Sequence, residues 1–200
     1  MPNPPPGTTI PPYTSVGQFS NGDLATIWNA LNNIEQAVEQ TYFASVTGLL
    51  NGATPTDVFT ISGSATKKIK IKRYGVVGIK SVNSNIDVIS LIRTTLNTGG
   101  TSTSPTIVKA DSTNATPTAI VKAYTLNPTL GTLNGNIRSS KLFFNTLGNA
   151  GSTNLLVEFG TGNNQAPILN GVNDMFCINA NGQIITGGNW DIFVEFTEIS

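Results

Sequence analysis

Apolar residues recur at helical spacing near the N-terminus of the chain. Between residues 20 and 47 they fall three and four positions apart, at Leu24, Ile27, Leu31, Ile34 and Val38. This spacing places them on one face of a helix, which Trp28 and Tyr42 widen. Ser20 is a suitable N-cap, and no proline interrupts residues 22–45. The pattern predicts an amphipathic helix over residues 20–47, which either packs on its own domain or associates with other copies, most simply as a trimer.

From residue 51 onward the apolar residues follow a period of two. Such alternation, with glycine, asparagine or proline between the runs, is typical of strands joined by turns. The predicted strands are 58–62, 68–74, 86–94, 120–126, 141–145, 155–159, 175–179, 183–186 and 190–197. Asn181 with Gly182 gives the clearest signal for a hairpin turn, and Asn134 with Gly135 is a further turn signal. Short strands without helices between them predict a mainly β fold, a jelly-roll-like antiparallel β-sandwich over residues 51–200.

Two of these strands carry more specific predictions. A single apolar face close to the C-terminus is formed by Trp190, Ile192, Val194 and Phe196. We therefore expect truncation of this tail to unfold the domain. In the strand 68–74, lysines alternate with Ile69 and Ile71, which is typical of an edge strand protected by charge. An acidic patch on a neighbouring subunit is the alternative explanation for these lysines.

The first 19 residues are rich in proline, with Pro4, Pro5, Pro6, Pro11 and Pro12 among them. Proline excludes a helix or an interior strand here and favours an extended arm with polyproline character. A plain linker would not need the apolar residues Tyr13, Val16 and Phe19. The segment is therefore either a disordered terminus or an arm that docks on a partner.

Charged residues make up only 11% of the chain and cancel to a net charge of zero. Such a chain has no long-range field to attract nucleic acid or an anionic membrane, so we expect neither partner. Threonine, serine, asparagine and glycine supply the polarity instead, and these residues favour strands and turns. The sequence has no secretory signal pattern and no apolar run long enough to cross a bilayer, which predicts assembly in a cytoplasm.

Groups for catalysis or metal binding are scarce in the sequence. Histidine is absent and Cys177 is the single cysteine, which excludes a Ser-His-Asp triad, a zinc cluster and an intrachain disulfide. No carboxylates stand in a glycosidase or metal-loop motif. We expect Glu195 and Glu198 to be solvated, Asp111 and Asp174 to cap turns, and Cys177 to be buried. The sequence thus predicts no enzyme activity, no metal and no cofactor.

Three stretches of the chain resemble a known class of proteins: residues 59–78 (FTISGSATKKIKIKRYGVVG), 91–144 and 182–198. They resemble the sandwich domain of small virion proteins that tailed phages encode among their structural genes. The segments 97–102 (NTGGTS) and 123–125 (AYT) are the most specific part. The resemblance covers the chain from Phe59 onward, leaves residues 1–50 outside it, and implies a virion setting without catalytic residues.

The pattern and the resemblance together predict an auxiliary head protein, also called a decoration or cement protein. Such a protein would lie on the capsid surface of the virion, bind the major capsid protein through the arm (residues 1–19) and form a homotrimer through the helix. The alternative is a receptor- or carbohydrate-binding module of a head fibre or tail fibre. That alternative would favour aromatic residues on loops, whereas Tyr74, Tyr124 and Trp190 lie within predicted strands.

Overall fold

The computed structural model describes residues 26–27, 39–52, 54–144, 146, 154–162, 164–185 and 187–199. The chain divides into two compact units, Met1–Val38 and Glu39–Ser200. In the first unit Thr26 and Ile27 are described, and both are helical. The predicted arm lies outside the described residues. So does the rest of the apolar stripe on the predicted helix, which consists of Leu24, Leu31, Ile34 and Val38 in addition to Ile27. The docking arm, the trimer and the packing of the helix on its own domain therefore stay predictions.

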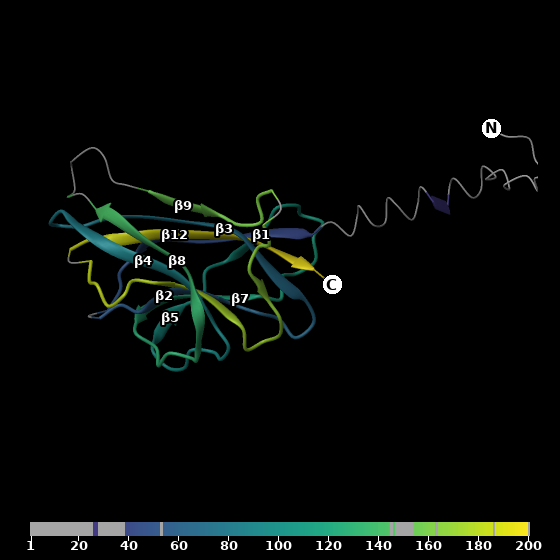
Figure 1. Ribbon diagram of the computed structural model, residues 1–200, viewed down its shortest axis with the longest axis horizontal. Helices are drawn as coiled ribbons and strands as arrows, with labels where there is room; N and C mark the ends of the chain where they lie inside the picture. Colours follow the sequence, from purple (N-terminus) through teal and green to yellow (C-terminus); the bar gives the residue numbers. More distant parts are fainter. Residues whose placement is uncertain are drawn as a thin grey trace, which may run out of the picture. The chain divides into compact units, whose positions relative to one another are not determined.

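The second unit is a sandwich of two antiparallel sheets, which Figure 1 shows as two layers. Sheet A consists of β10 (Ile168–Leu169), β3 (Lys68–Ile79), β12 (Asn189–Ile199), β1 (Gln40–Leu49) and β6 (Ile107–Lys109), with β9 (Leu155–Glu158) also beside β3. Sheet B consists of β5 (Thr101–Thr103), β7 (Ile120–Leu126), β2 (Asp57–Ser62), β11 (Met175–Asn179), β4 (Ser84–Arg93) and β8 (Leu133–Phe144). The predicted mainly β antiparallel sandwich is confirmed, and the jelly-roll connectivity stays a prediction.

The core lies between the inner faces of the two sheets. Its largest fully buried side chains include Tyr42, Phe59, Tyr74, Phe144, Phe176, Trp190 and Phe196. The Phe144 and Trp190 rings meet edge to face with centroids 5.1 Å apart, which joins β8 of sheet B to β12 of sheet A. The predicted apolar face of β12 is confirmed, since its four members are each at most 2% exposed. Strand β12 lies between β3 and β1, at the centre of sheet A.

Strand β1 corrects the predicted end of the N-terminal helix. The heptad pattern predicts a helix up to residue 47, but residues 40–49 form a strand that pairs with β12 from Gln40 opposite Glu198. Tyr42 and Ala44 are buried in the core and alternate with more exposed neighbours. Beyond Val38 the sequence is rich in aromatic and β-branched residues at a period of two, which suits a strand. The sandwich therefore begins near residue 39 and not at residue 51.

Strand β3 is an internal strand, so the predicted edge strand is wrong. It pairs with β12 on one side and with β10 and β9 on the other. Ile69 and Ile71 are fully buried, whereas the lysines between them face the outer side of the sheet. Alternating lysines show only that one face of a strand meets solvent, and an internal strand of an antiparallel sheet can have such a face.

Several smaller elements also differ from the sequence-based expectation. The short strands β5, β6 and β10, and the strand β1, were not predicted. Strand β8 begins at Leu133, so Asn134 and Gly135 lie inside it and form no turn. Residues 183–185 of the predicted strand 183–186 form no strand. Asn181 and Gly182 have the expected positive φ, 51° and 73°, but their turn leads from sheet B towards sheet A and closes no hairpin.

Candidate functional site

The outer faces of the two sheets differ in how the chain covers them. In sheet B, strands β2 and β11 are buried on both sides, and Leu91, Met175 and Cys177 form a second apolar cluster there. Burial raises the pKa of the Cys177 thiol well above its ordinary value, which confirms the expected buried cysteine. Both sheets also carry partly exposed apolar side chains. In sheet B they lie on β7 and β8, and in sheet A they include Leu156 and Phe193, which border a groove.

A buried polar network covers sheet B and holds its loops in place. Asp57, which is 1% exposed, accepts hydrogen bonds from Arg93 Nε at 2.6 Å and Nη2 at 3.0 Å, from Asn97 at 2.7 Å and from Asn179 at 2.7 Å. Arg93 Nη1 also donates to the carbonyl of Gly131 at 2.9 Å. Burial raises the pKa of Asp57, but these hydrogen bonds outweigh it and hold that pKa below its ordinary value. The network is structural and joins β2, β4, β11 and the loop before β8.

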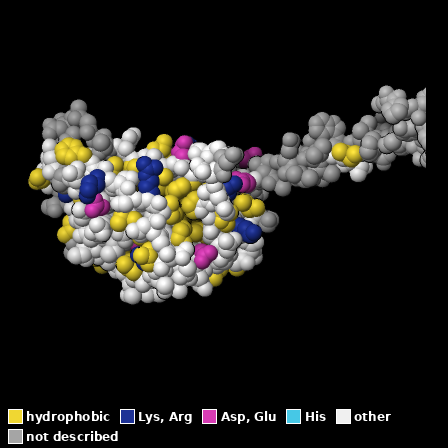
Figure 2. Space-filling view, viewed as in Figure 1, with side chains coloured by type: hydrophobic (Ala, Val, Ile, Leu, Met, Phe, Trp, Pro, Cys, Tyr) yellow, Lys and Arg dark blue, Asp and Glu magenta, His cyan; other side chains and the backbone are white. Residues whose placement is uncertain are grey.

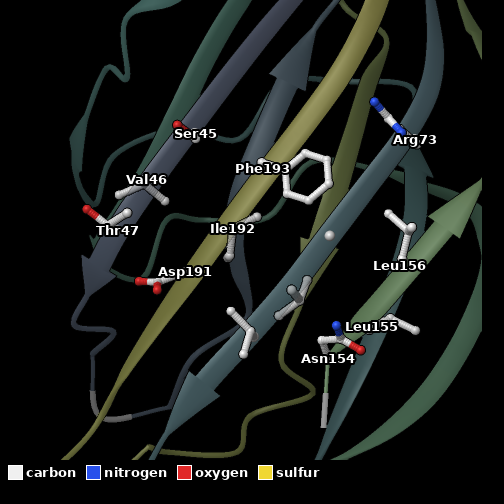
Figure 3. Close-up of a pocket in the computed structure, with 13 residues that line it drawn as sticks. Ser45, Val46, Thr47, Arg73, Asn154, Leu155, Leu156, Asp191, Ile192 and Phe193 are labelled. Carbon is white, nitrogen blue, oxygen red and sulfur yellow. The ribbon is translucent and has the colours of Figure 1, made fainter. Parts of the chain in front are cut away.

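The outer face of sheet A contains a groove of about 460 Å³, drawn in Figure 3. One row of residues crosses its floor: Leu156 on β9 pairs with Gly75 on β3, Gly75 with Phe193 on β12, and Phe193 with Ser45 on β1. The Phe193 ring lies over Gly75, because a Cβ added to this glycine would be 2.1 Å from the ring. Phe193 is 37% exposed and Leu156 52% exposed. The glycine thus makes room for an aromatic ring on the outer surface of the sheet.

Charged side chains stand on opposite sides of the Phe193 ring, as Figure 3 shows for Arg73 and Asp191. Arg73 pairs with Glu195 at 2.5 Å and with Glu158 at 3.8 Å. Asp191 accepts a hydrogen bond from the backbone N–H of Gly48 at 2.7 Å. The groove therefore has an apolar floor, a carboxylate at one end and, at the other end, an arginine that is already paired with two glutamates.

A second group of charges fixes the point where the chain enters sheet A. Glu39 pairs with Lys70 and with Lys72, the latter at 3.6 Å, and accepts a hydrogen bond from Thr197 at 3.2 Å. Burial raises the pKa of Glu39, but the two lysines and the threonine outweigh it and lower that pKa below its ordinary value. Two of the lysines on β3 thus find an acidic partner within their own chain.

The two C-terminal glutamates are not solvated, so that expectation is wrong. The Glu195 side chain is 16% exposed and paired with arginine. Glu198 is 3% exposed and accepts hydrogen bonds from the N–H and hydroxyl of Thr118, at 2.6 and 3.0 Å, and from the N–H of Ala119 at 2.9 Å. The alternation that points Phe196 inward also places Glu198 on the inner side of β12, where residues 118–119 and the ammonium of Lys67, 3.3 Å away, satisfy its carboxylate.

The other acidic predictions are confirmed. Asp111 accepts a hydrogen bond from the N–H of Thr113, and Asp174 from the N–H of Asn170, each at 2.8 Å within its own turn.

Within the described ranges, no three histidine, cysteine, aspartate or glutamate residues gather into a group that could hold a metal ion. In the same part of the chain, no helix is long and apolar enough to cross a membrane.

The aromatic residues considered for a glycan site are buried. Trp190 and Tyr74 are 0% exposed and Tyr124 is 3% exposed. Figure 2 shows a face on which charged side chains are few and scattered among neutral and hydrophobic groups. A surface of this kind carries no extended field of one sign, in keeping with the zero net charge of the chain.

The sequence-predicted site residues and the groove are different parts of the chain. Of the predicted oligomer interface the structure describes Ile27, and the capsid-binding arm lies outside the described residues. Sequence reasoning did not single out Gly75, Leu156 or Phe193. One signal was present: Phe193 occupies an outward position of β12 between Asp191 and Glu195, where alternation favours a polar residue.

Comparisons with protein-family models, with curated proteins and with solved structures find no match to this chain. The chemistry of the groove therefore has to be inferred from its own residues. Its floor is apolar, its ends are charged, and it lies on the outer face of sheet A.

Proposed function

We propose that this chain is a structural virion protein, which binds the outer surface of a tailed-phage capsid and decorates or stabilises it. The observation that carries the proposal is the open outer face of sheet A, with Gly75, Leu156 and Phe193 between Arg73 and Asp191. An apolar centre with a charged rim is typical of surfaces that bind other proteins. The resemblance in the sequence supplies the virion setting.

In this proposal the sandwich covers the shell and adds contacts through this face, while the N-terminal segment anchors the protein. The arm, residues 1–19, binds the major capsid protein; fully extended it reaches about 60 Å, enough to cross between neighbouring subunits. The apolar stripe joins copies, as a homotrimer, so that several arms bind at a high effective concentration. The contacts of Glu39 with Lys70 and Lys72 support this role, since they hold the residue just before β1 against β3.

A second candidate function is a receptor- or carbohydrate-binding module of a head or tail fibre. The exposed Phe193 ring favours it, because a sugar can stack on such a ring while Asn154 and Asp191 bind its hydroxyls. The buried Trp190 and Tyr74 give it no support. Screening the wild type and a Phe193→Ser variant on a glycan array separates the two functions: a glycan that the wild type binds and the variant does not would favour the fibre module.

Re-binding to particles that lack the protein tests the capsid proposal. Full-length protein and a form without residues 1–19 are added to such particles, and the bound copies are measured after sedimentation. We expect the full chain to bind and the truncated chain, although folded, to be lost. As a matched pair, Phe19→Asp should weaken binding, whereas Thr8→Asp adds the same charge to the arm without removing an apolar side chain. Failure of the full chain to bind would contradict the proposal, and equal retention of both forms would move the attachment to the sandwich.

A further inference from the structure

We propose that Asn170 modifies itself: the backbone nitrogen of Gly171 attacks its side-chain amide, and the residue becomes a mixture of aspartate and isoaspartate. An Asn-Gly pair favours this reaction, because glycine has no Cβ to crowd the attacking nitrogen. One such pair, at Asn21, lies outside the described residues. The others lie within them, at Asn51, Asn134, Asn170 and Asn181. Of these four pairs, the one at Asn170 leaves both reacting groups free.

The reaction needs water and no other partner. The nitrogen of Gly171 forms a bond with the side-chain carbonyl carbon of Asn170, and its proton leaves with the amide group as ammonia. Water then opens the resulting succinimide ring at either of its two carbonyl carbons. One opening gives aspartate, and the other gives isoaspartate, in which the main chain runs through the side-chain carbon. A fast reaction therefore needs a backbone N–H that no acceptor holds, a side-chain amide free to turn, and access to water.

Asn170 meets these conditions. Asn170 and Gly171 are both exposed, between β10 and β11, and Asn170 borders a cleft of about 680 Å³. Neither the N–H of Gly171 nor the side chain of Asn170 makes a hydrogen bond with another described residue. The backbone N–H of Asn170 donates to the Asp174 carboxylate at 2.8 Å, which holds the residue without engaging either reacting group. Beyond its chain neighbours, no atom lies within 4 Å of a Cβ added to Gly171, so the space beside this glycine is open.

Asn181 is the matched case in which the reacting groups are held. It is exposed like Asn170, and its following glycine also has a positive φ, 73° compared with 90° at Gly171. The N–H of Gly182 donates to the carbonyl of Pro55 at 2.7 Å, and the Asn181 side chain donates to Asp87 at 3.2 Å. Attack at Asn181 therefore has to wait for a local opening that breaks these hydrogen bonds.

The other two pairs are protected by strand pairing and by burial. Asn134 and Gly135 lie inside β8, whose ladder with β4 holds the backbone extended and keeps the attacking nitrogen away from the side-chain carbon. The side-chain nitrogen of Asn51 is buried. A Cβ added to Gly52 would lie 3.1 Å from the carbonyl oxygen of Thr125, so this pair is closely packed. Water has little access to it.

The modification changes a turn that connects sheet A to sheet B. The N–H of Gly63 donates to the carbonyl of Asp174 at 2.8 Å. The carbonyl oxygen of Gly171 also packs on Gly63, since a Cβ added to Gly63 would be 2.1 Å from it. Isoaspartate lengthens the main chain by one carbon, and either product places a second carboxylate beside Asp174. We therefore expect the turn 170–174 to move away from Gly63 once Asn170 has reacted.

Peptide mapping by mass spectrometry tests the proposal on the full-length protein. The folded chain is incubated at mildly alkaline pH, and the same chain unfolded in guanidinium chloride is incubated beside it at the same pH and temperature. Unfolded, the four pairs have the same dipeptide sequence, so the ratio of folded to unfolded rates measures the protection that the structure gives. We expect a ratio within about threefold of one at Asn170. At Asn51, Asn134 and Asn181 it should be below about one tenth.

Two results would overturn the proposed reaction. The first is a ratio at Asn170 as low as at the other three pairs, or a faster folded reaction at any of those pairs. The second is a product that contains aspartate without isoaspartate, because direct hydrolysis of the side chain gives aspartate alone, whereas the succinimide gives both.

Hydrogen exchange at the Gly63 amide tests the effect on the turn. Wild type and an Asn170→Gln variant are incubated together, since glutamine would have to close a six-membered ring and reacts far more slowly. We expect the Gly63 amide to exchange at least fivefold faster in the modified wild type than before incubation, and at an unchanged rate in the variant. Equal exchange in the two incubated proteins would contradict the expected movement of the turn. Neither measurement uses virus particles, so a negative result here leaves the proposed function standing.

Discussion

Replacing Asp57 with asparagine tests whether the buried network fastens the loops of the sandwich. In the wild type the carboxylate accepts hydrogen bonds from Arg93, Asn97 and Asn179. Asparagine has the same shape but only one accepting oxygen, and its amide group would face the donors of its neighbours. The substitution therefore leaves the guanidinium of Arg93, which is 5% exposed, buried without its anion.

The size of the effect follows from these contacts. Breaking a buried ion pair by removing one partner costs about 3–5 kcal/mol, because the other charge stays uncompensated. The carbonyl of Gly131 still accepts from Arg93, and the asparagine oxygen retains part of the network, which keeps the loss within this range. We expect Asp57→Asn to lower the free energy of unfolding by about 3–5 kcal/mol, which is roughly 6–20 °C in melting temperature for a domain of this size.

Urea unfolding followed by circular dichroism measures this loss by linear extrapolation. Asp87→Asn is the matched control, because it makes the same chemical change in an ion pair with Lys141, whose side chain is 72% exposed. The control should lose no more than about 1 kcal/mol. Equal losses in the two variants would refute the reasoning, since the buried network would then contribute no more than an exposed pair.

Three further predictions concern acid, the C-terminal strand and self-association. Because the pKa of Asp57 is lower in the folded chain than the value of about 3.9 in the unfolded one, its stabilisation is complete above that value and is lost as the pH falls through the folded pKa. The urea concentration at the unfolding midpoint should therefore decrease when the pH is lowered beyond about 4. Between pH 6 and 8 it should stay constant, because no histidine titrates there and the raised pKa keeps Cys177 protonated. A midpoint that moves in that neutral range would contradict this prediction. Glu198→Gln should destabilise the sandwich by about 2–3 kcal/mol in thermal melts, because a buried charged acceptor is lost. The control, Glu158→Gln on the exposed side of β9, should have little effect. Similar melting temperatures for the two variants would show that the Glu198 contacts are weak. Leu31→Asp should lower the mass of the oligomer in light scattering by placing a charge in a dry interface, and a wild type that is already monomeric at high concentration would end this interpretation.

The sequence predicts those strands best whose alternation and flanking turns agree. The predicted segments 120–126 and 175–179 coincide with β7 and β11, because apolar runs there are bounded by turn residues on both sides. Strand β1 was missed because it follows a helical pattern without an intervening glycine or proline. Its strand conformation depends on pairing with β12, at the other end of the chain, which no local pattern can reveal.

The groove was harder to predict than the fold. Gly75 and Phe193 lie far apart in the sequence and meet only through the register of β3 with β12. The same holds for Asp57 and its partners, which come from three strands and a loop. Glu198 is different, because extending the alternation of Trp190 to Phe196 by two residues places it on the inner face. Local periodicity thus shows which way a side chain points, while its partner depends on strand order.

Quantitative mass spectrometry of purified virus particles tests the proposed role of this chain more directly than any variant. Peptides of the chain are counted against peptides of the major capsid protein in particles purified by density gradient. A decoration protein should be present in a copy number of the same order as the major capsid protein, and washing at moderate salt should not remove it. Absence of the chain from the particles, or only a handful of copies as in a tail or fibre, would contradict a role on the capsid surface.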